Sequence, residues 1–253
     1  MKKILTLTVA SFLTFSPLVH AAESGHKLEN QQWSFEGIFG TYDRGALQRG
    51  FQVYSQVCSA CHSMKYLSYR NLEALGYTDD EVKAIASQYT IMDGPNDEGE
   101  MFERARKPSD RFKSPYDNDK AARYANGGAL PPDLSLITKA REGGADYVYG
   151  ILTGYEEPPE GVDLAAGQHW NKVMAGNKIA MAAPLSDDIV SYEDGSPTTV
   201  DQYARDVAQF LTWAAEPEME IRKRTGIKVI LFLLAFAGIM YSVKKKIWAD
   251  VKH

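Results

Sequence analysis

Cys58 and Cys61 are the only two cysteines of this 253-residue chain, and both stand in one pentapeptide, Cys58-Ser59-Ala60-Cys61-His62. A C-x-x-C-H sequence is typical of c-type haem attachment. The two thiols form thioethers with the vinyl groups of one porphyrin, and the histidine becomes an axial ligand of its iron. We therefore expect one covalently bound haem c, with the rest of the chain organised around this segment.

Two other uses of a C-x-x-C pair fit the sequence less well. A zinc site needs a second pair of ligands, but the remaining histidines of the sequence do not form a C-x-x-C or H-x-x-x-H partner. Those histidines are His20, His26, His169 and His253. A thioredoxin-like redox pair belongs to a βαβ unit, which the sequence pattern does not indicate.

The two ends of the chain differ from its middle. The first residues combine Lys2 and Lys3 with an apolar run that ends in Val19-His20-Ala21, the pattern of a cleaved secretory signal peptide. Residues 225–243 are apolar except for Lys228 and have basic flanks. As a helix they would span about 28 Å, close to the thickness of a bilayer core. The alternative for the N-terminal segment is an uncleaved membrane anchor. The alternative for residues 225–243 is a buried core helix.

These features predict four segments. We expect a signal peptide at residues 1–21, an exported domain at 22–220, a transmembrane anchor with basic flanks at 221–246 and a cytoplasmic tail at 247–253. The protein would then be a single-pass protein of the bacterial inner membrane, with its domain on the periplasmic side.

Charge separates along the same boundaries. Ten of the 28 basic residues lie in the signal peptide, the flanks of the anchor or the tail, whereas 32 of the 33 acidic residues lie in the exported part. The exported part therefore carries a net charge of about −14, which favours a basic partner and argues against nucleic acid. The alternative explanation is that the negative charge of the domain serves only its solubility.

The exported part has the pattern of a mainly helical domain. Apolar residues recur at helical spacing after Asp43, and capping boxes begin at Thr78 and Thr199. We expect helices at residues 43–57, 64–75, from 78, at 145–152 and at 199–213. The last of these should pack against the first. Residues 31–42 should form an extended arm, and the acidic residues 93–116, which are rich in proline and glycine, a long surface loop.

A sixth ligand for the iron has to come from farther along the chain. Met181 lies in the small, apolar, proline-ended segment Ala180-Met181-Ala182-Ala183-Pro184, and Met174 is the second candidate. A thioether ligand raises the redox potential and closes the iron to other ligands, which suits electron transfer. The alternative role for Met181 is to fill a gap in the hydrophobic core.

Further contacts to the haem are less distinctive in the sequence. The segment Gly127-Gly128-Ala129-Leu130-Pro131-Pro132-Asp133-Leu134 can approach a flat ligand closely, although it could also be an ordinary turn. Arg141 and Tyr147 are candidates for binding the haem propionates. The alternative interpretation is that these two side chains are only exposed to solvent, as most arginines are.

Taken together, these segments resemble the cytochrome c1 family, whose members are the haem subunits of quinol:cytochrome c reductase. The resemblance covers most of residues 40–245. It is carried by CSACHSMKYLSYRNL, NGGALPPDLS, KAREGGADYVYGILTGYEEPPEGV, IAMAAPLSDDIVSYEDGSP and DVAQFLTWAAEPEMEIRKRTG.

The resemblance implies a mainly α fold, similar to class I cytochrome c with long insertions, plus one C-terminal transmembrane helix. It implies proximal ligation by His62, distal ligation by Met181, propionate contacts from Arg141 and Tyr147, and haem packing by Asn126, Ala129, Pro132 and Leu134. The implied partners are cytochrome b, a Rieske iron–sulfur protein that donates electrons and a soluble cytochrome c that accepts them, within a dimeric complex.

Some bacterial members of this family carry an additional cysteine pair near the distal loop, and this sequence does not. We therefore expect packing around Pro184 to hold the Met181 segment in place. Turnover of a substrate by this chain alone is not expected. The alternative function is that of a subunit of another membrane haem enzyme, a peroxidase or terminal oxidase with an open iron.

Overall fold

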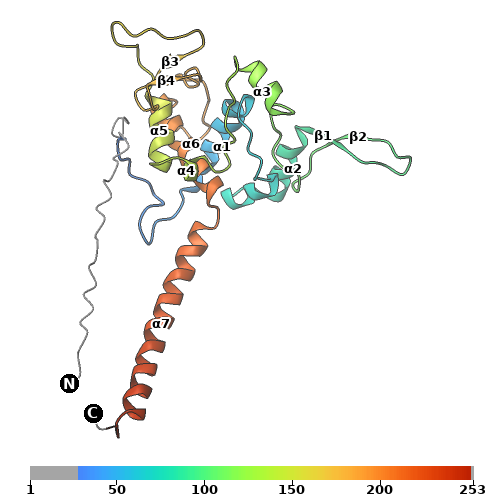
Figure 1. The fold of residues 1–253 in the computed structure, drawn as a ribbon. Coiled ribbons are helices and arrows are strands. Elements are labelled where there is room, and N and C mark those ends of the chain that lie inside the picture. The colour runs from blue at the N-terminus through green and yellow to red at the C-terminus, as the bar shows by residue number, and fades with distance from the viewer. Residues whose placement is uncertain (1–27, 252–253) are drawn as a thin grey trace, which may run out of the picture.

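The computed structural model describes residues 28–251, so the predicted signal peptide at residues 1–21 lies outside the described residues. The described chain forms a mainly helical domain from which one long C-terminal helix projects (Figure 1). The fold class predicted from the sequence is confirmed.

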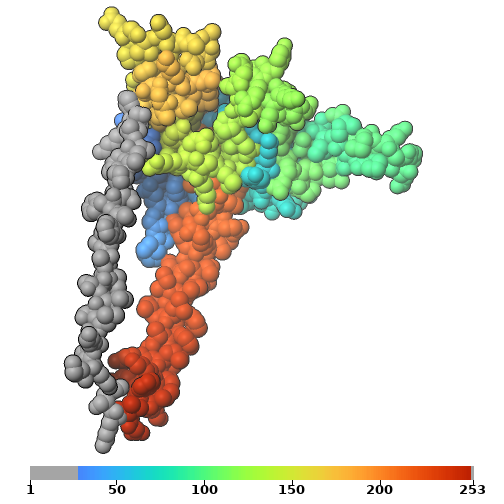
Figure 2. Space-filling view, in the orientation of Figure 1, coloured from blue at the N-terminus to red at the C-terminus, as the bar shows by residue number. Residues whose placement is uncertain are grey.

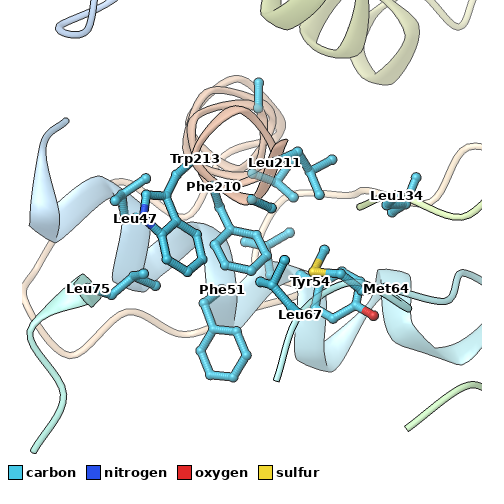
Figure 3. Packing of buried hydrophobic residues seen from close by; sticks show 14 of the residues in the cluster. Leu47, Phe51, Tyr54, Met64, Leu67, Leu75, Leu134, Phe210, Leu211 and Trp213 are labelled. Atoms are coloured by element: carbon cyan, nitrogen blue, oxygen red, sulfur yellow. The ribbon is translucent and has the colours of Figure 1, made fainter. Parts of the chain in front are cut away.

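Helices α1 (Arg44–Gln56) and α6 (Val200–Ala215) form the centre of the domain. They cross so closely that a Cβ atom at Gly50 would lie 2.1 Å from the carbonyl oxygen of Asp206, so only glycine fits there. Phe51 and Tyr54 of α1 pack against Phe210 of α6 in the core (Figure 3). The predicted pairing of the first and last domain helices is confirmed.

A buried ion pair joins the same two helices. Asp206 is fully buried, and the Arg49 guanidinium donates to both of its carboxylate oxygens at 2.9 and 3.0 Å. The same guanidinium reaches Asp194 at 2.7 Å, and Gln202 donates to Asp206 at 3.0 Å. This network links α1, α6 and the segment that leads into α6.

The N-terminal arm packs on the domain as predicted. Trp33 is buried, and its indole N–H donates to the carboxylate of Asp146 at 2.7 Å. Asp146 belongs to α5 (Gly144–Thr153), which covers the predicted helix at residues 145–152. Asp43 and Thr199 are N-caps as predicted, and the capping box of Thr78 begins α2 (Asp79–Ser87). The capping box predicted at Thr199 is only half formed, because the Gln202 side chain donates to Asp206 instead.

The helix predicted at residues 64–75 is only partly correct. A 3₁₀ helix, η2, covers Tyr69–Leu75, whereas residues 64–68 are not helical. The reason is that the amides of Lys65 and Tyr66 donate to side chains of residues 133 and 135 rather than to helix carbonyls.

The prediction of one long loop at residues 93–116 is wrong in its first part. Strands β1 (Thr90–Asp93) and β2 (Phe102–Ala105) form an antiparallel hairpin that projects from the domain (Figure 1). The Asn96 side chain closes the turn by accepting from the amides of Glu98 and Glu100. Arg104 pairs with Asp93 and with Asp110, and its hydrogen bond lowers the pKa of Asp110 to about 2.

Between the hairpin and α6 the chain forms short elements joined by loops. These are α3 (Asp119–Ala125), α4 (Ile137–Ala140), α5, and the two-residue strands β3 (His169–Trp170) and β4 (Lys178–Ile179), which pair with each other. Helix α5 packs on α6, so this region is built onto the α1–α6 centre.

Helix α7 (Met219–Ile247) begins after Pro217, two residues before the predicted anchor. By length and composition it is the one helix of the described residues that could cross a membrane. Its 29 residues would extend about 43 Å at 1.5 Å per residue. The apolar side chains of its membrane-length part are exposed around the whole helix.

Candidate functional site

The C-x-x-C-H segment follows directly from α1. The helix ends at Gln56, and the chain then winds into a short 3₁₀ helix, η1 (Cys58–Ala60). The amides of Cys61 and His62 both donate to the carbonyl of Cys58, at 3.2 and 2.9 Å. This tight turn presents two thiols and one imidazole from a single rigid loop.

The two cysteines are free thiols in this fold. Cys58 is half-buried, and burial raises its pKa to about 12, whereas Cys61 is exposed. Both are therefore free of a disulfide and available for bonds to another group. This state is consistent with thioether formation and gives no sign of a structural disulfide.

His62 is oriented by a second segment of the chain. Its Nδ1 lies 2.8 Å from the carbonyl oxygen of Pro132. A carbonyl only accepts hydrogen bonds, so Nδ1 carries the proton and Nε2 keeps its lone pair. Burial also lowers the pKa of His62, which favours the neutral ring. Histidines that bind metals are commonly held in this way by a partner on the other ring nitrogen.

Asp133 locks the Pro132 segment onto the histidine loop. Its carboxylate accepts from the Ser63 hydroxyl at 2.7 Å, from the Lys65 amide at 2.8 Å and from the Ser135 amide at 2.9 Å. Burial alone would raise the pKa of Asp133, but these hydrogen bonds outweigh it and lower the pKa. The carboxylate is thus ionised at neutral pH and holds the two segments together.

Of the other residues predicted to pack against the haem, Leu134 contacts the histidine loop directly, whereas the hydrogen bonds of Asn126 and Ala129 lie within residues 116–129. Leu134 is buried, and its amide donates to the Ser63 carbonyl at 2.9 Å. The Asn126 side chain donates to the Tyr116 hydroxyl and to the Ala122 carbonyl. Ala129 is half-buried after the turn at Gly127 and Gly128, and its amide donates to the Asn126 carbonyl.

Met181 and Met174 lie on the loops around β4. Met181 is half-buried two residues after the strand, and the Tyr155 hydroxyl donates to its carbonyl at 3.0 Å. Met174 is contacted instead by the Tyr147 hydroxyl, 3.8 Å from its sulfur. Arg141 is exposed, and its guanidinium donates to the Ala140 carbonyl.

Tyr155 is the main support of the Met181 segment. Within the described residues, the backbone of residues 180–185 receives hydrogen bonds only from the Tyr155 hydroxyl, which also lies 3.4 Å from the carbonyl of Ala182. Burial raises the pKa of Tyr155 to about 12, so the hydroxyl remains a donor. Packing around Pro184 as the support of this segment stays a prediction, whereas the polar contact from Tyr155 is observed.

Asn171 anchors Tyr155 in turn. It is fully buried, donates to the Ile151 carbonyl at the end of α5, and accepts from the amides of Val173 and Met174. A β-bridge pairs it with Tyr155. The loop that carries both methionines is therefore attached to a helix of the core.

From the sequence we did not single out Asp133, Tyr155 or Asn171 as site residues. Asp133 had a local signal, because an aspartate that accepts from the amide two residues later forms an Asx turn. Tyr155 and Asn171 gave no such signal, since their partners lie about 20 to 26 residues away.

The donor set fits a haem better than a bare metal ion. Over residues 28–251, no group of three or more His, Cys, Asp or Glu side chains comes together that could hold a metal. A porphyrin brings four ligands of its own and needs only axial ligands from the protein. One oriented imidazole beside two free thiols, with a methionine on a separate anchored loop, matches that requirement.

Comparison with known proteins agrees with this arrangement. The model of the Cytochrome C1 family matches residues 33–251. "Cytochrome c1" of Rhodospirillum rubrum is 47% identical, over 95% of this chain and 94% of that protein. "Cytochrome c1 2, heme protein, mitochondrial" of Arabidopsis thaliana is 50% identical, over 96% of this chain and 80% of that protein.

A third relative is a longer protein. "Cytochrome b/c1" of Bradyrhizobium diazoefficiens is 51% identical over 95% of this chain, and the alignment spans 38% of that protein. The family match extends over the haem-attachment motif, the Met181 loop and α7 together. This chain belongs to the cytochrome c1 family.

Proposed function

We propose that the chain carries one haem c, attached through Cys58 and Cys61, with His62 and Met181 as the axial ligands of its iron. The contact between His62 Nδ1 and the Pro132 carbonyl carries this proposal, because it leaves Nε2 free to bind iron. Asn126, Ala129, Pro132 and Leu134 pack against the haem, and Arg141 and Tyr147 bind its propionates. When bound, the haem supplies a one-electron redox couple.

The protein's own residues keep the site suited to electron transfer. Asp133 fixes the segment that orients His62, and Tyr155 fixes the backbone that carries Met181. An imidazole and a thioether together exclude other ligands and favour a high potential. We propose a carrier of single electrons from a Rieske iron–sulfur protein to a soluble cytochrome c, without substrate turnover of its own.

We also propose that the chain works beside cytochrome b in a dimeric quinol:cytochrome c reductase. The Bradyrhizobium relative whose name joins cytochrome b and c1 supports this assembly. The proposed place is the bacterial inner membrane, with residues 1–21 as a signal peptide, residues 22–220 in the periplasm, α7 in the bilayer and residues 247–253 in the cytoplasm.

Electron delivery to the soluble partner should weaken with salt, because the proposed periplasmic part is strongly acidic. In the detergent-purified complex, stopped-flow reoxidation by a basic cytochrome c should slow several-fold from about 10 mM to about 150 mM salt. Over that range the Debye length falls from roughly 30 to 8 Å. A rate that stays constant would contradict electrostatic docking.

A separate experiment tests the attachment site. A chain with both Cys58→Ser and Cys61→Ser should lose haem staining on a denaturing gel, whereas the wild-type chain keeps it. Haem that remains with the denatured double variant would contradict attachment through these cysteines.

Tyr155→Phe should loosen the methionine ligand while leaving the fold intact. One hydrogen bond contributes about 1 kcal/mol, so the fraction of protein with Met181 off the iron should rise about fivefold. Carbon monoxide binding to the reduced protein and the methionine-to-iron charge-transfer band of the oxidised protein measure this fraction. Tyr149→Phe on α5 is the matched control, because its hydroxyl contacts Asp201 instead. Equal behaviour of the two variants would refute a role for Tyr155.

A further inference from the structure

Residues 36–41, which we call the interfacial loop, carry two of the most exposed apolar side chains of the domain. Ile38 is 68% exposed and Phe39 is 84% exposed. Neighbouring aromatic residues of the same arm behave differently, since Trp33 and Tyr42 are buried. The two apolar side chains therefore stand on an exposed loop that lies between two buried aromatic residues.

The shape of the interfacial loop is fixed by its backbone. Gly37 has a φ of +69°, a conformation that favours glycine. A Cβ atom at Gly40 would lie 1.9 Å from the carbonyl oxygen of Glu36, so the turn closes only with glycine there. The loop thus presents Ile38 and Phe39 at its tip in a defined conformation.

The loop is attached to the first turns of α7. Lys223 donates to the carbonyls of Phe35 and Gly40, at 2.6 and 3.1 Å, and so holds both ends of the loop. Glu220 accepts from the Tyr42 amide at 2.8 Å and pairs with Arg44 at 2.8 Å. Figure 2 shows this part of the N-terminal segment, in blue, beside the upper end of α7.

A groove of about 250 Å³ separates the loop from the helix. Ile38 and Phe39 line it on one side, and Arg224 and Ile227 of α7 on the other. The apolar run of α7, residues 225–243, starts at this groove, because Ile227 itself lines it. The tip of the loop therefore lies at the level where α7 would enter the hydrocarbon.

We propose that the interfacial loop inserts Ile38 and Phe39 into the outer leaflet of the bilayer that α7 spans. The occupant of this surface is lipid, because the loop continues the exposed apolar surface that runs around α7. Arg224 lines the same groove, where a cation complements anionic headgroups. Amphipathic segments bind membranes by placing apolar side chains at this boundary. The proposal rests on the membrane assignment of α7.

Such an insertion would give the domain a second point of attachment. A single helix leaves a domain free to tilt about its exit point, whereas a helix and a rigid loop define a plane. The loop would thus fix the orientation of the haem domain relative to the membrane surface.

The test uses the haem-loaded full chain in lipid nanodiscs, with acyl chains that are either plain or brominated near the headgroup. Phe39→Trp adds one indole to the four native tryptophans. The emission added by this residue should fall at least twofold in the brominated lipid. Comparing the two lipids cancels quenching by the haem. Tyr124→Trp is the matched control, because Tyr124 is a 93% exposed aromatic residue on α3, and its added emission should be equal in both lipids.

The native residue Trp248, just beyond α7, distinguishes a failure of the loop insertion from a failure of the membrane assignment of α7. Its emission, obtained by difference with Trp248→Phe, should also be quenched if α7 spans the bilayer. Quenching at Trp248 without quenching at residue 39 would overturn the insertion of the loop alone. Absence of quenching at Trp248 would overturn the membrane assignment of α7, and the proposal with it.

Discussion

Replacing Met181 with leucine should lower the midpoint potential of the haem by more than about 0.1 V, within the ~0.8 V range over which axial ligands set haem potentials. Leucine keeps the apolar volume but has no sulfur to bind iron. The variant should therefore also bind carbon monoxide when reduced. Redox titration in the visible absorption bands and a carbon monoxide difference spectrum measure the two effects.

Met174→Leu is the matched control for this experiment. Met174 lies on the loop before β4, whereas Met181 follows the strand, and the sulfur of Met174 contacts the Tyr147 hydroxyl. Its replacement should leave the potential nearly unchanged. The opposite result, a large shift for Met174→Leu and none for Met181→Leu, would transfer the ligand role to Met174. A shift in neither variant would contradict methionine ligation.

Replacing Arg49 with leucine should produce the largest loss of stability, about 3–5 kcal/mol in the free energy of unfolding. Asp206 is fully buried and accepts two hydrogen bonds from this guanidinium, whose pKa is raised by them. Without Arg49 the carboxylate would remain in the core with only Gln202 as a partner. Denaturant unfolding, followed by circular dichroism, measures the loss.

The double variant Arg49→Leu with Asp206→Leu shows whether the cost comes from the unpaired charge. Removing both members of a buried ion pair is often close to neutral, because the desolvation of both charges is relieved. The double variant should therefore be more stable than Arg49→Leu alone. A double variant that loses as much as the two single variants together would show that the pair is not coupled.

Most predictions that depend on neighbouring residues were correct in this chain. Asp43 caps α1, the Thr78 capping box begins α2 and Thr199 caps α6, although the Thr199 capping box is not completed because the Gln202 side chain donates to Asp206. These contacts join residues two or three positions apart, so the sequence contains both partners. The attachment motif belongs to the same class, because its chemistry lies within five consecutive residues.

The secondary-structure predictions were wrong where groups outside the local pattern form hydrogen bonds with the backbone. Residues 64–68 have a helical pattern, yet the amides of Lys65 and Tyr66 donate to side chains of residues 133 and 135. Residues 93–116 contain prolines and glycines typical of a loop, yet residues 102–105 pair with residues 90–93 as a hairpin, and Arg104 bridges it to Asp110. In both regions hydrogen bonds beyond the local pattern decide the structure.

The attachment motif, the helical character of the domain, the N-cap positions and the apolar C-terminal helix could all be predicted from the amino-acid sequence. The three-dimensional fold was needed to show that Pro132 orients His62, that Tyr155 holds the Met181 backbone, and that residues 38 and 39 lie beside the start of α7. The difference lies in distance along the chain. Propensity and periodicity describe residues within one or two turns of each other, whereas these contacts join segments from 26 to about 190 residues apart.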